Sequence, residues 1–253
     1  MQPRHYTKRL NSIKPTYISV VVPAYNEQDR ISNSLDTLIE YLSAQSYEWE
    51  IIVVDDGSDD NTNTVVQKRL NDSRIKLITL PHAGKGFAIK TGMLSAEGQI
   101  RLMCDADMAM PVSYIADFLS NINKKNQPIV IGSRQIPGSK RFNESNFRHL
   151  LGRLYNLWIK TFVISEYSDT QCGFKCFTAD SVNKIFPLQR LDGFGFDIEI
   201  LLIAKLMGLN TKELPIEWHH GSNSKVNPLL DSFKMFIDTI IIKMNLCLGR
   251  YNE

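Results

Sequence analysis

The sequence predicts an α/β fold with a single, mostly parallel central sheet that is flanked by helices. Two observations lead to this prediction. Short runs of β-branched residues alternate along the chain with segments whose apolar residues recur at helical spacing. Buried parallel strands are continuous apolar runs of this kind, and the helices that connect them cover both faces of the sheet.

The first half of the chain carries this alternation most clearly. Strands are expected over residues 17–22, 49–56, 75–80 and 99–107. Helices are expected between them, over residues 26–45, 60–70 and 86–98, and the last of these ends at Gly98. In such sheets ligands bind beyond the carboxyl ends of the strands, so the loops after the strands are the first place to look for a site.

The second half is less regular. Its expected elements are a strand at 128–134, a helix at 147–163, a strand or hairpin at 169–178, a helix at 194–208, a strand at 211–220 and a helix at 229–248. We find no repeat or linker. The organisation predicted is a polar extension (1–16), one compact domain (17–227), and a C-terminal amphipathic helix with its tail (228–253).

Composition limits the class of protein. The 253 residues are 43% hydrophobic and 22% charged, as in an ordinary globular chain, and the net charge of +2 does not favour nucleic-acid binding. The four cysteines do not predict a disulfide framework, and the polar N-terminus does not resemble a signal peptide. A cytoplasmic protein is expected, with peripheral contact at the cytoplasmic membrane face as an open possibility.

Acidic or polar loops follow three of the expected strands. These loops are PAYNE after the first strand, DDGS after the second and DAD after the fourth. Asp105 and Asp107 should repel each other unless a divalent cation lies between them. The alternative is a solvated turn, which is the commoner explanation for an Asp-x-Asp taken alone.

Four blocks in the first half resemble the family 2 glycosyltransferases, which have the nucleotide-diphospho-sugar transferase (GT-A type) fold. The blocks are ISVVVPAYNEQDRI, EIIVVDDGSDDNT, GKGFAIKTGM and DADMAMP. Four later blocks resemble the branch that glycosylates dolichyl and bacterial polyprenyl phosphates. They are IGSR, DTQCGFKCF, GFGFDIEIL and IEWHHGSNSKV. The resemblance covers residues 17–245.

This resemblance implies a binding site for a nucleotide-sugar donor. Its expected residues are Pro23, Tyr25, Glu27, Asp55, Asp56, Lys85 and Asp105. Asp55 and Asp56 can accept hydrogen bonds from base N–H groups and ribose hydroxyls. The alternatives are that these two acids cap a helix and that Lys85 is a surface lysine.

The resemblance also implies a metal cofactor and a catalytic acid. Asp107, with Asp105 beside it, is expected to hold Mg²⁺ or Mn²⁺ against the pyrophosphate. Asp197 is expected to act as a general base if the acceptor is a sugar hydroxyl, or to orient the donor sugar if the acceptor is a phosphate. Asp197 could instead be a helix N-cap, and Glu199 is expected to be an ordinary helix residue.

Residues expected near the acceptor or the pyrophosphate come from four blocks. They are Ser133, Arg134, Arg153, Gln171, Ser224 and Lys225. The C-terminal helix carries an apolar stripe made of Leu229, Phe233, Phe236, Ile237, Ile240 and Met244. The stripe either packs on the domain or lies at the bilayer surface beside a lipid acceptor.

Together these features predict a metal-dependent, inverting hexosyltransferase. Its expected reaction moves glucose from UDP-glucose to a polyprenyl phosphate such as dolichyl or undecaprenyl phosphate. Alternatives are GDP-mannose as the donor, a carbohydrate acceptor as in surface-polysaccharide assembly, and a non-catalytic protein that binds nucleotide sugars. The intact DAD and FDIE blocks argue against the last of these.

Overall fold

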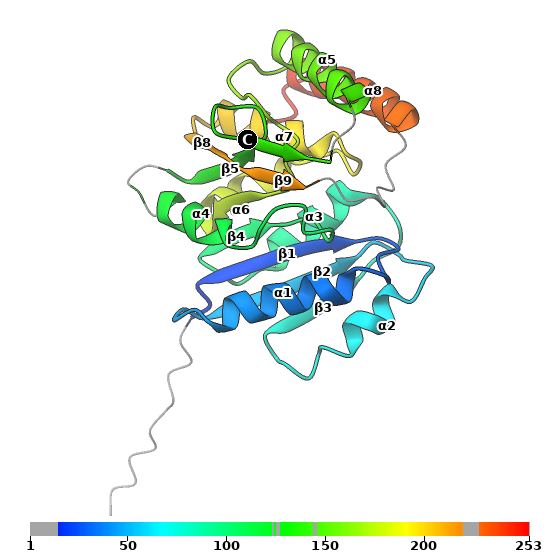
Figure 1. The fold of residues 1–253 in the computed structure, drawn as a ribbon. Coiled ribbons are helices and arrows are strands. Elements are labelled where there is room, and N and C mark those ends of the chain that lie inside the picture. Colours follow the sequence, from blue (N-terminus) through cyan, green and yellow to red (C-terminus); the bar gives the residue numbers. More distant parts are fainter. Residues whose placement is uncertain (1–14, 123, 125–126, 144–145, 220–227, 253) are drawn as a thin grey trace, which may run out of the picture.

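The computed structural model describes residues 15–122, 124, 127–143, 146–219 and 228–252. In this part of the chain the predicted α/β fold is confirmed, with one seven-stranded sheet between layers of helices (Figure 1). The strand order is β3-β2-β1-β4-β7-β5-β8. The strands are β1 Ile18–Ala24, β2 Trp49–Asp55, β3 Ile75–Thr79, β4 Ile100–Met103, β5 Ile129–Ser133, β7 Lys175–Thr178 and β8 Thr211–Pro215.

The sheet is parallel except at β7, which runs antiparallel to both of its neighbours, β4 and β5. The register places Ala24 of β1 opposite Asp55 of β2, and Val21 of β1 opposite Met103 of β4. The three strands therefore end at one edge of the sheet. The PAYNE, DDGS and DAD loops begin there, as the topology of parallel sheets requires.

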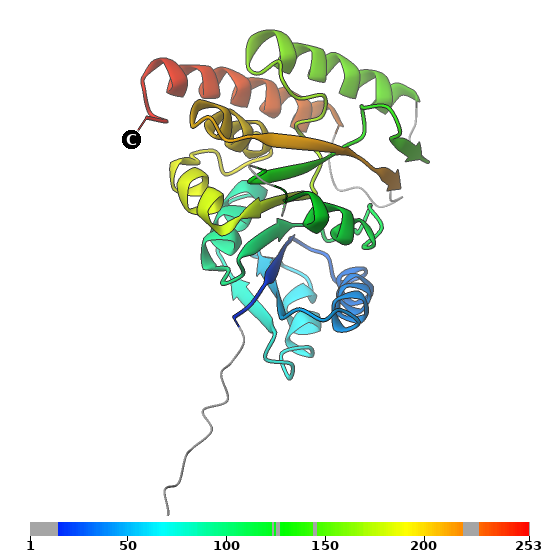
Figure 2. The same cartoon turned by 90° about the vertical axis from the view of Figure 1, so that its left-hand side faces the viewer.

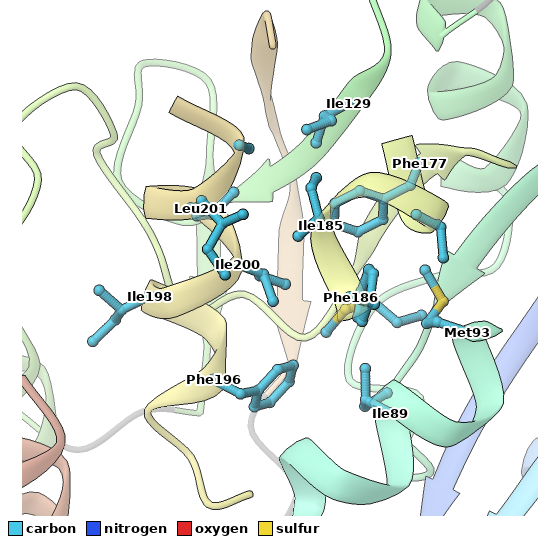
Figure 3. Packing of buried hydrophobic residues seen from close by; sticks show 14 of the residues in the cluster. Ile89, Met93, Ile129, Phe177, Ile185, Phe186, Phe196, Ile198, Ile200 and Leu201 are labelled. Carbon is cyan, nitrogen blue, oxygen red and sulfur yellow. The ribbon is translucent and has the colours of Figure 1, made fainter. Parts of the chain in front are cut away.

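Two apolar cores lie on opposite faces of the sheet. Along β1, Val20 and Val22 point into one core and Val21 into the other, as expected for a strand that is buried on both faces. Helices α1 and α4 cover the first face, and α3, α6 and α7 cover the second (Figure 3). The helices are α1 Ile31–Ser43, α2 Thr62–Gln67, α3 Lys85–Ser95, α4 Tyr114–Ile122, α5 Asn146–Phe162, α6 Ala179–Ile185, α7 Phe196–Leu206 and α8 Pro228–Cys247, with a short 3-10 helix at Phe186–Leu188.

Helices α5 and α8 lie side by side at the β8 end of the sheet, outside α7 (Figures 1 and 2). Each contributes one buried isoleucine, Ile159 and Ile242, to the core that α7 helps to form. The C-terminal helix expected at 229–248 is confirmed as α8. Among the described residues, no helix is long and apolar enough to cross a membrane.

The expected strand at 211–220 is wrong in one respect, because it forms two strands in different sheets. The first, β8, ends at Pro215, which has no N–H to continue a ladder. After the buried Ile216, β9 (Glu217–His219) pairs in parallel with β6 (Lys140–Phe142) in a small second sheet. Elements β6, α4 and α6 were not predicted from the sequence, and within 169–178 only residues 175–178 form a strand, β7.

Candidate active site

A cavity of about 660 Å³ lies at the carboxyl edge of β1, β2 and β4, within the usual range of roughly 300–1,000 Å³ for small-molecule sites. Residues from six parts of the chain line it: the loop after β1, the DDGS loop after β2, the loop before α3, the DAD loop, the loop before α7, and α8. Seven of the expected site residues are among them: Pro23, Tyr25, Glu27, Asp56, Lys85, Asp105 and Asp107.

The other expected residues fall elsewhere. Asp55, Asp197, Ser133, Arg134, Arg153 and Gln171 are not part of the cavity lining. Ser224 and Lys225 lie outside the described residues. Several lining residues were not expected from the sequence: Arg30, His82, Phe194, Lys234, Met235 and Asp238.

An aromatic pair forms one wall of the cavity. The rings of Tyr25 and His82 stack with centroids 4.1 Å apart and an interplanar angle of 19°. Nδ1 of His82 lies 3.0 Å from the carbonyl oxygen of Asp56, and Tyr25 is 37% exposed. His82 directly precedes the AGKG sequence, and this position is the feature of the sequence that could have identified it as a site residue. The pair offers a flat apolar face of the kind on which a nucleobase can stack.

The two acids of the DDGS loop mainly form hydrogen bonds within the protein. Asp55 accepts from the backbone N–H and hydroxyl of Ser58 at 3.0 and 2.5 Å, and from Nδ2 of Asn63 at 3.2 Å. Asp56 accepts from the N–H groups of Ala83 and Gly84, both at 2.9 Å. Asp56 therefore holds the loop before α3 at the cavity. The oxygens of Asp55 are already occupied by intramolecular bonds, which differs from the expected base or ribose contact.

The DAD loop carries the strongest electrostatic features of the cavity. Nζ of Lys85 lies 2.6 Å from Oδ1 of Asp105. Burial alone would raise the pKa of Asp105, but Lys85 holds it below its ordinary value. Burial and the neighbouring Asp105 raise the pKa of Asp107. One more positive charge would therefore be favourable beside Asp107.

Gly173 brings the DTQCGFKCF segment into direct contact with the DAD loop. A Cβ atom at Gly173 would lie 1.9 Å from Oδ2 of Asp105, which is far inside van der Waals contact. Any side chain at this position would therefore displace the carboxylate. Next to it, Nζ of the fully buried Lys175 donates to the carbonyl oxygen of Cys172 at 2.6 Å.

Asp197 forms a buried ion pair with Lys175 below the cavity floor. The Asp197 side chain is 5% exposed, and burial raises its pKa despite the attraction of Lys175 and Lys85. It lies in the first turn of α7 but makes no side-chain cap, because Gly195 occupies the N-cap position. Asp197 is therefore placed to anchor Lys175 and the backbone beside Gly173.

Arg134 is likewise held by a carboxylate. Its Nε and Nη2 donate to the two oxygens of Asp169 at 2.7 and 2.9 Å. Although burial raises the pKa of Asp169, Arg134 lowers it to about 2. Asp169 also accepts from the N–H of Gln171, whose Nε2 lies 3.8 Å from the sulfur of Met235 on α8.

The remaining acceptor-side candidates are scattered. Ser133 is fully buried in β5, and Arg153 is exposed on α5. Glu199 accepts from the backbone N–H of Leu191 at 2.8 Å and from the hydroxyl of Tyr251 at 2.7 Å. Glu199 therefore ties the C-terminal tail to the loop before α7, which is a structural role, as expected.

The inward side of helix α8 is mixed, with the buried Ile242, Thr239 and Asn245, while most of its large exposed side chains are apolar. Asp238 accepts from the N–H of Gly195 at 3.1 Å, and Thr239 accepts from Nε1 of Trp158 on α5 at 3.0 Å. The exposed side chains of the two helices form what we call the α5–α8 apolar surface. It consists of Leu154, Leu157, Phe162, Phe233, Phe236, Ile237, Ile240, Met244 and Leu248.

The acids of the DAD loop fit a divalent cation that arrives with a phosphate ligand. In the described part of the chain, no cluster of three or more His, Cys, Asp or Glu side chains could hold a metal by itself. Magnesium sites commonly use one or two carboxylates and complete their shell with substrate phosphates and water. Asp105 and Asp107 supply such a pair at the cavity.

The Lys175–Asp197 pair yields a stability prediction. Lys175→Met should lower the free energy of unfolding by about 3–5 kcal/mol near neutral pH, because Asp197 is left as a buried, unpaired carboxylate. Its pKa then rises further above the unfolded value. A carboxyl group with a raised pKa destabilises the fold more and more as pH rises from its pKa in the unfolded chain toward its pKa in the folded protein. The loss in the free energy of unfolding should therefore be smaller at about pH 5 than at about pH 8.

Urea denaturation at the two pH values measures this loss. The control is Lys184→Met, which removes an exposed pair with Asp180 and should change stability by less than about 1 kcal/mol. Equal effects of the two substitutions would contradict the structural role given to Lys175.

Comparison with solved structures agrees with the architecture. Glucosyl-3-phosphoglycerate synthase from Mycobacterium tuberculosis, in complex with UDP, superposes with a TM-score of 0.66 at 20% identity, over 90% of this chain and 80% of that chain. Its complex with Mn²⁺, UDP and glucosyl-3-phosphoglycerate gives a TM-score of 0.67 at 18% identity, with the same coverage. The expected GT-A type fold is confirmed by this likeness.

Sequence comparison gives the family. The chain is 34% identical to the dolichyl-phosphate beta-glucosyltransferases of Dictyostelium discoideum and Saccharomyces cerevisiae, over 94% of its length and 77% of theirs. Its identity to the human protein of that name is 30%, over 92% of this chain and 77% of the relative. The model for glycosyl transferase family 2 matches residues 19–184. With the fold and these relatives, this match shows that the chain belongs to glycosyl transferase family 2.

Proposed function

We propose that this protein transfers glucose from UDP-glucose to a polyprenyl phosphate such as dolichyl or undecaprenyl phosphate, with inversion at the anomeric carbon. One observation carries the proposal. Helix α8 forms a wall of the cavity with Lys234 and Asp238, and it also exposes Phe233, Ile240 and Met244 on the α5–α8 apolar surface. A cavity that carries charged side chains is thus joined to an apolar surface by a single helix.

The relatives and structural neighbours support the two substrates separately. The similar sequences are named dolichyl-phosphate beta-glucosyltransferases, which suggests the lipid acceptor and glucose. The neighbouring synthase has been solved with Mn²⁺ and UDP-glucose, which suggests the donor and the cation. The cavity offers the Tyr25–His82 face to the base and Lys85 to the pyrophosphate.

Asp105 and Asp107 are the residues that would hold Mg²⁺ or Mn²⁺. When bound, the cation would neutralise negative charge on the departing nucleoside diphosphate. Lys85, which pairs with Asp105 at 2.6 Å, would add a second positive charge at the same place. Arg30 lies farther out and is held by Glu27, with Nη2 to Oε1 at 2.6 Å.

A phosphate acceptor makes a general base unnecessary. The second pKa of a phosphate monoester is about 6, so its oxygen is already ionised at neutral pH. This oxygen would attack the anomeric carbon from the side opposite UDP, which leaves with the bonding electron pair. A β-linked product then follows from the α-linked donor. The burial of Asp197 in its pair with Lys175 supports this acceptor, because an ion-paired acid off the cavity surface is poorly placed to remove a proton.

The α5–α8 apolar surface would rest on the membrane that holds the acceptor. Phe233, Met244 and Leu157 are 65%, 57% and 62% exposed, although soluble monomers seldom leave such a contiguous group uncovered. The ring of Trp158 contacts those of Phe162 and Phe236, with centroids 3.9 and 4.6 Å apart, and the second contact joins α5 to α8. Its occupant would be the lipid interface, in the manner of amphipathic helices that lie on bilayers.

The first functional prediction concerns the cation. Asp107→Asn should keep the fold and reduce transfer by at least about a hundredfold, since a charged group that neutralises the leaving diphosphate is lost. Transfer from radiolabelled UDP-glucose measures the effect, with Asp117→Asn on α4 as the control. Undiminished activity of metal-stripped enzyme in EDTA would refute the metal requirement.

The second prediction concerns the acceptor. Farnesyl phosphate should be glycosylated, whereas farnesol should not, because the neutral alcohol must lose its proton and Asp197, the base expected from the sequence, is buried in its pair with Lys175. Product analysis by chromatography separates the two cases. Equal transfer to farnesol, or to a free oligosaccharide, would instead favour a carbohydrate acceptor.

The third prediction concerns the membrane. Replacing both Phe233 and Met244 by Ser should weaken association with liposomes by at least about tenfold, since burying each side chain contributes roughly 1.5–3 kcal/mol. UDP affinity should not change. The control is the pair Leu94→Ser and Leu206→Ser, which removes exposed leucines on α3 and α7. If both double variants bind liposomes alike, the α5–α8 apolar surface is not the membrane contact.

A further inference from the structure

Lys234 stands where the cavity and the α5–α8 apolar surface meet. It lines the cavity together with Met235, Ile237 and Asp238 of the same helix. Its neighbour Phe233 is 65% exposed, and Ile237 is both part of the cavity lining and 40% exposed. The apolar surface and the cavity therefore share Ile237, and Lys234 is a cation of α8 at the cavity.

The charges of the other cavity cations are already balanced at close range. Lys85 pairs with Asp105 at 2.6 Å, and Arg30 pairs with Glu27. Outside the cavity lining, Arg134 forms an ion pair with Asp169. Within the described residues, Lys234 has no carboxylate within 4.0 Å.

The nearest acid on the same face of α8 does not occupy Lys234. Asp238, one helical turn further on, accepts from the N–H of Gly195 at 3.1 Å. Lys234 lowers the pKa of Asp238 only as a charge at a distance, against the larger effect of burial. An ammonium group in this position is available to an incoming anion, and lysine is a common phosphate ligand.

We propose that Lys234 is the residue that positions the phosphate group of the lipid acceptor. This inference rests on the proposed function. The prenyl chain would lie along the α5–α8 apolar surface past Phe233 and Ile237, while its phosphate would pair with the Lys234 ammonium at the cavity rim. The phosphate would then face the donor sugar held between α8 and the DAD loop. Among the described residues expected from the sequence to bind the acceptor, Ser133, Arg134, Arg153 and Gln171, none lines the cavity.

Steady-state kinetics of the full chain with farnesyl phosphate and UDP-glucose tests the proposal. Lys234→Gln should raise KM for farnesyl phosphate by about tenfold to a hundredfold, the usual effect of losing one charge-assisted hydrogen bond. The affinity for UDP and the binding to neutral phosphatidylcholine vesicles should stay as in the wild type. Lys234→Arg should restore most of the loss, and Lys243→Gln on the same helix, outside the cavity lining, should have no effect.

Other outcomes separate this proposal from the proposed function. Weaker UDP binding by Lys234→Gln, with KM for farnesyl phosphate unchanged, would assign the lysine to the donor pyrophosphate and overturn the inference. An equal loss in Lys243→Gln, or no loss in either variant, would overturn it too. If the wild-type enzyme does not use farnesyl phosphate but glycosylates another acceptor, the proposed function itself fails, and the role of Lys234 fails with it.

Discussion

Negative charge at the carboxyl edge of the sheet constrains the rest of this structure. Three carboxylates there are each paired with a cation from a different part of the chain, in the pairs Lys85–Asp105, Arg134–Asp169 and Lys175–Asp197. Asp169 and Asp197 are buried, and a buried charge that loses its partner costs several kcal/mol, so their two pairs fix how β7 and α7 sit beside the DAD loop. Asp107 is left with a raised pKa, which is the electrostatic condition for binding a further cation.

Helix α8 is the second element that organises the structure, because one of its sides contacts the protein and the other is exposed. Asp238 accepts from the N–H of Gly195 and Ile242 packs in the core, while Phe233, Ile240 and Met244 face outward. The helix therefore has apolar side chains on its outward side as well as on its buried side. A membrane under the helix would bring a lipid phosphate to the cavity without requiring the acceptor to leave the bilayer.

Much of the fold could be predicted, because continuous apolar runs such as residues 17–22 identify buried parallel strands, and their carboxyl ends must share an edge. The features that could not be predicted from the sequence depend on tertiary contacts. Spacing does not reveal that Ser58 and Asn63 donate to Asp55, or that Gly173 leaves no room for a side chain beside Asp105. The position of Lys234 likewise depends on how α8 packs against α5, which no local pattern of residues encodes.

Manganese binding is the most direct test of a donor site built on the two acids of the DAD loop. Electron paramagnetic resonance can follow the loss of free Mn²⁺ as UDP is added to the wild type and to Gly173→Ala, in which the new methyl group must displace the carboxylate of Asp105. The wild type should bind Mn²⁺ when UDP is present, and the folded variant should bind it much more weakly, whereas Gly152→Ala, which meets nothing within 4 Å, should match the wild type. Unchanged Mn²⁺ binding by Gly173→Ala, or no binding by the wild type with UDP, would contradict a metal site at Asp105 and Asp107.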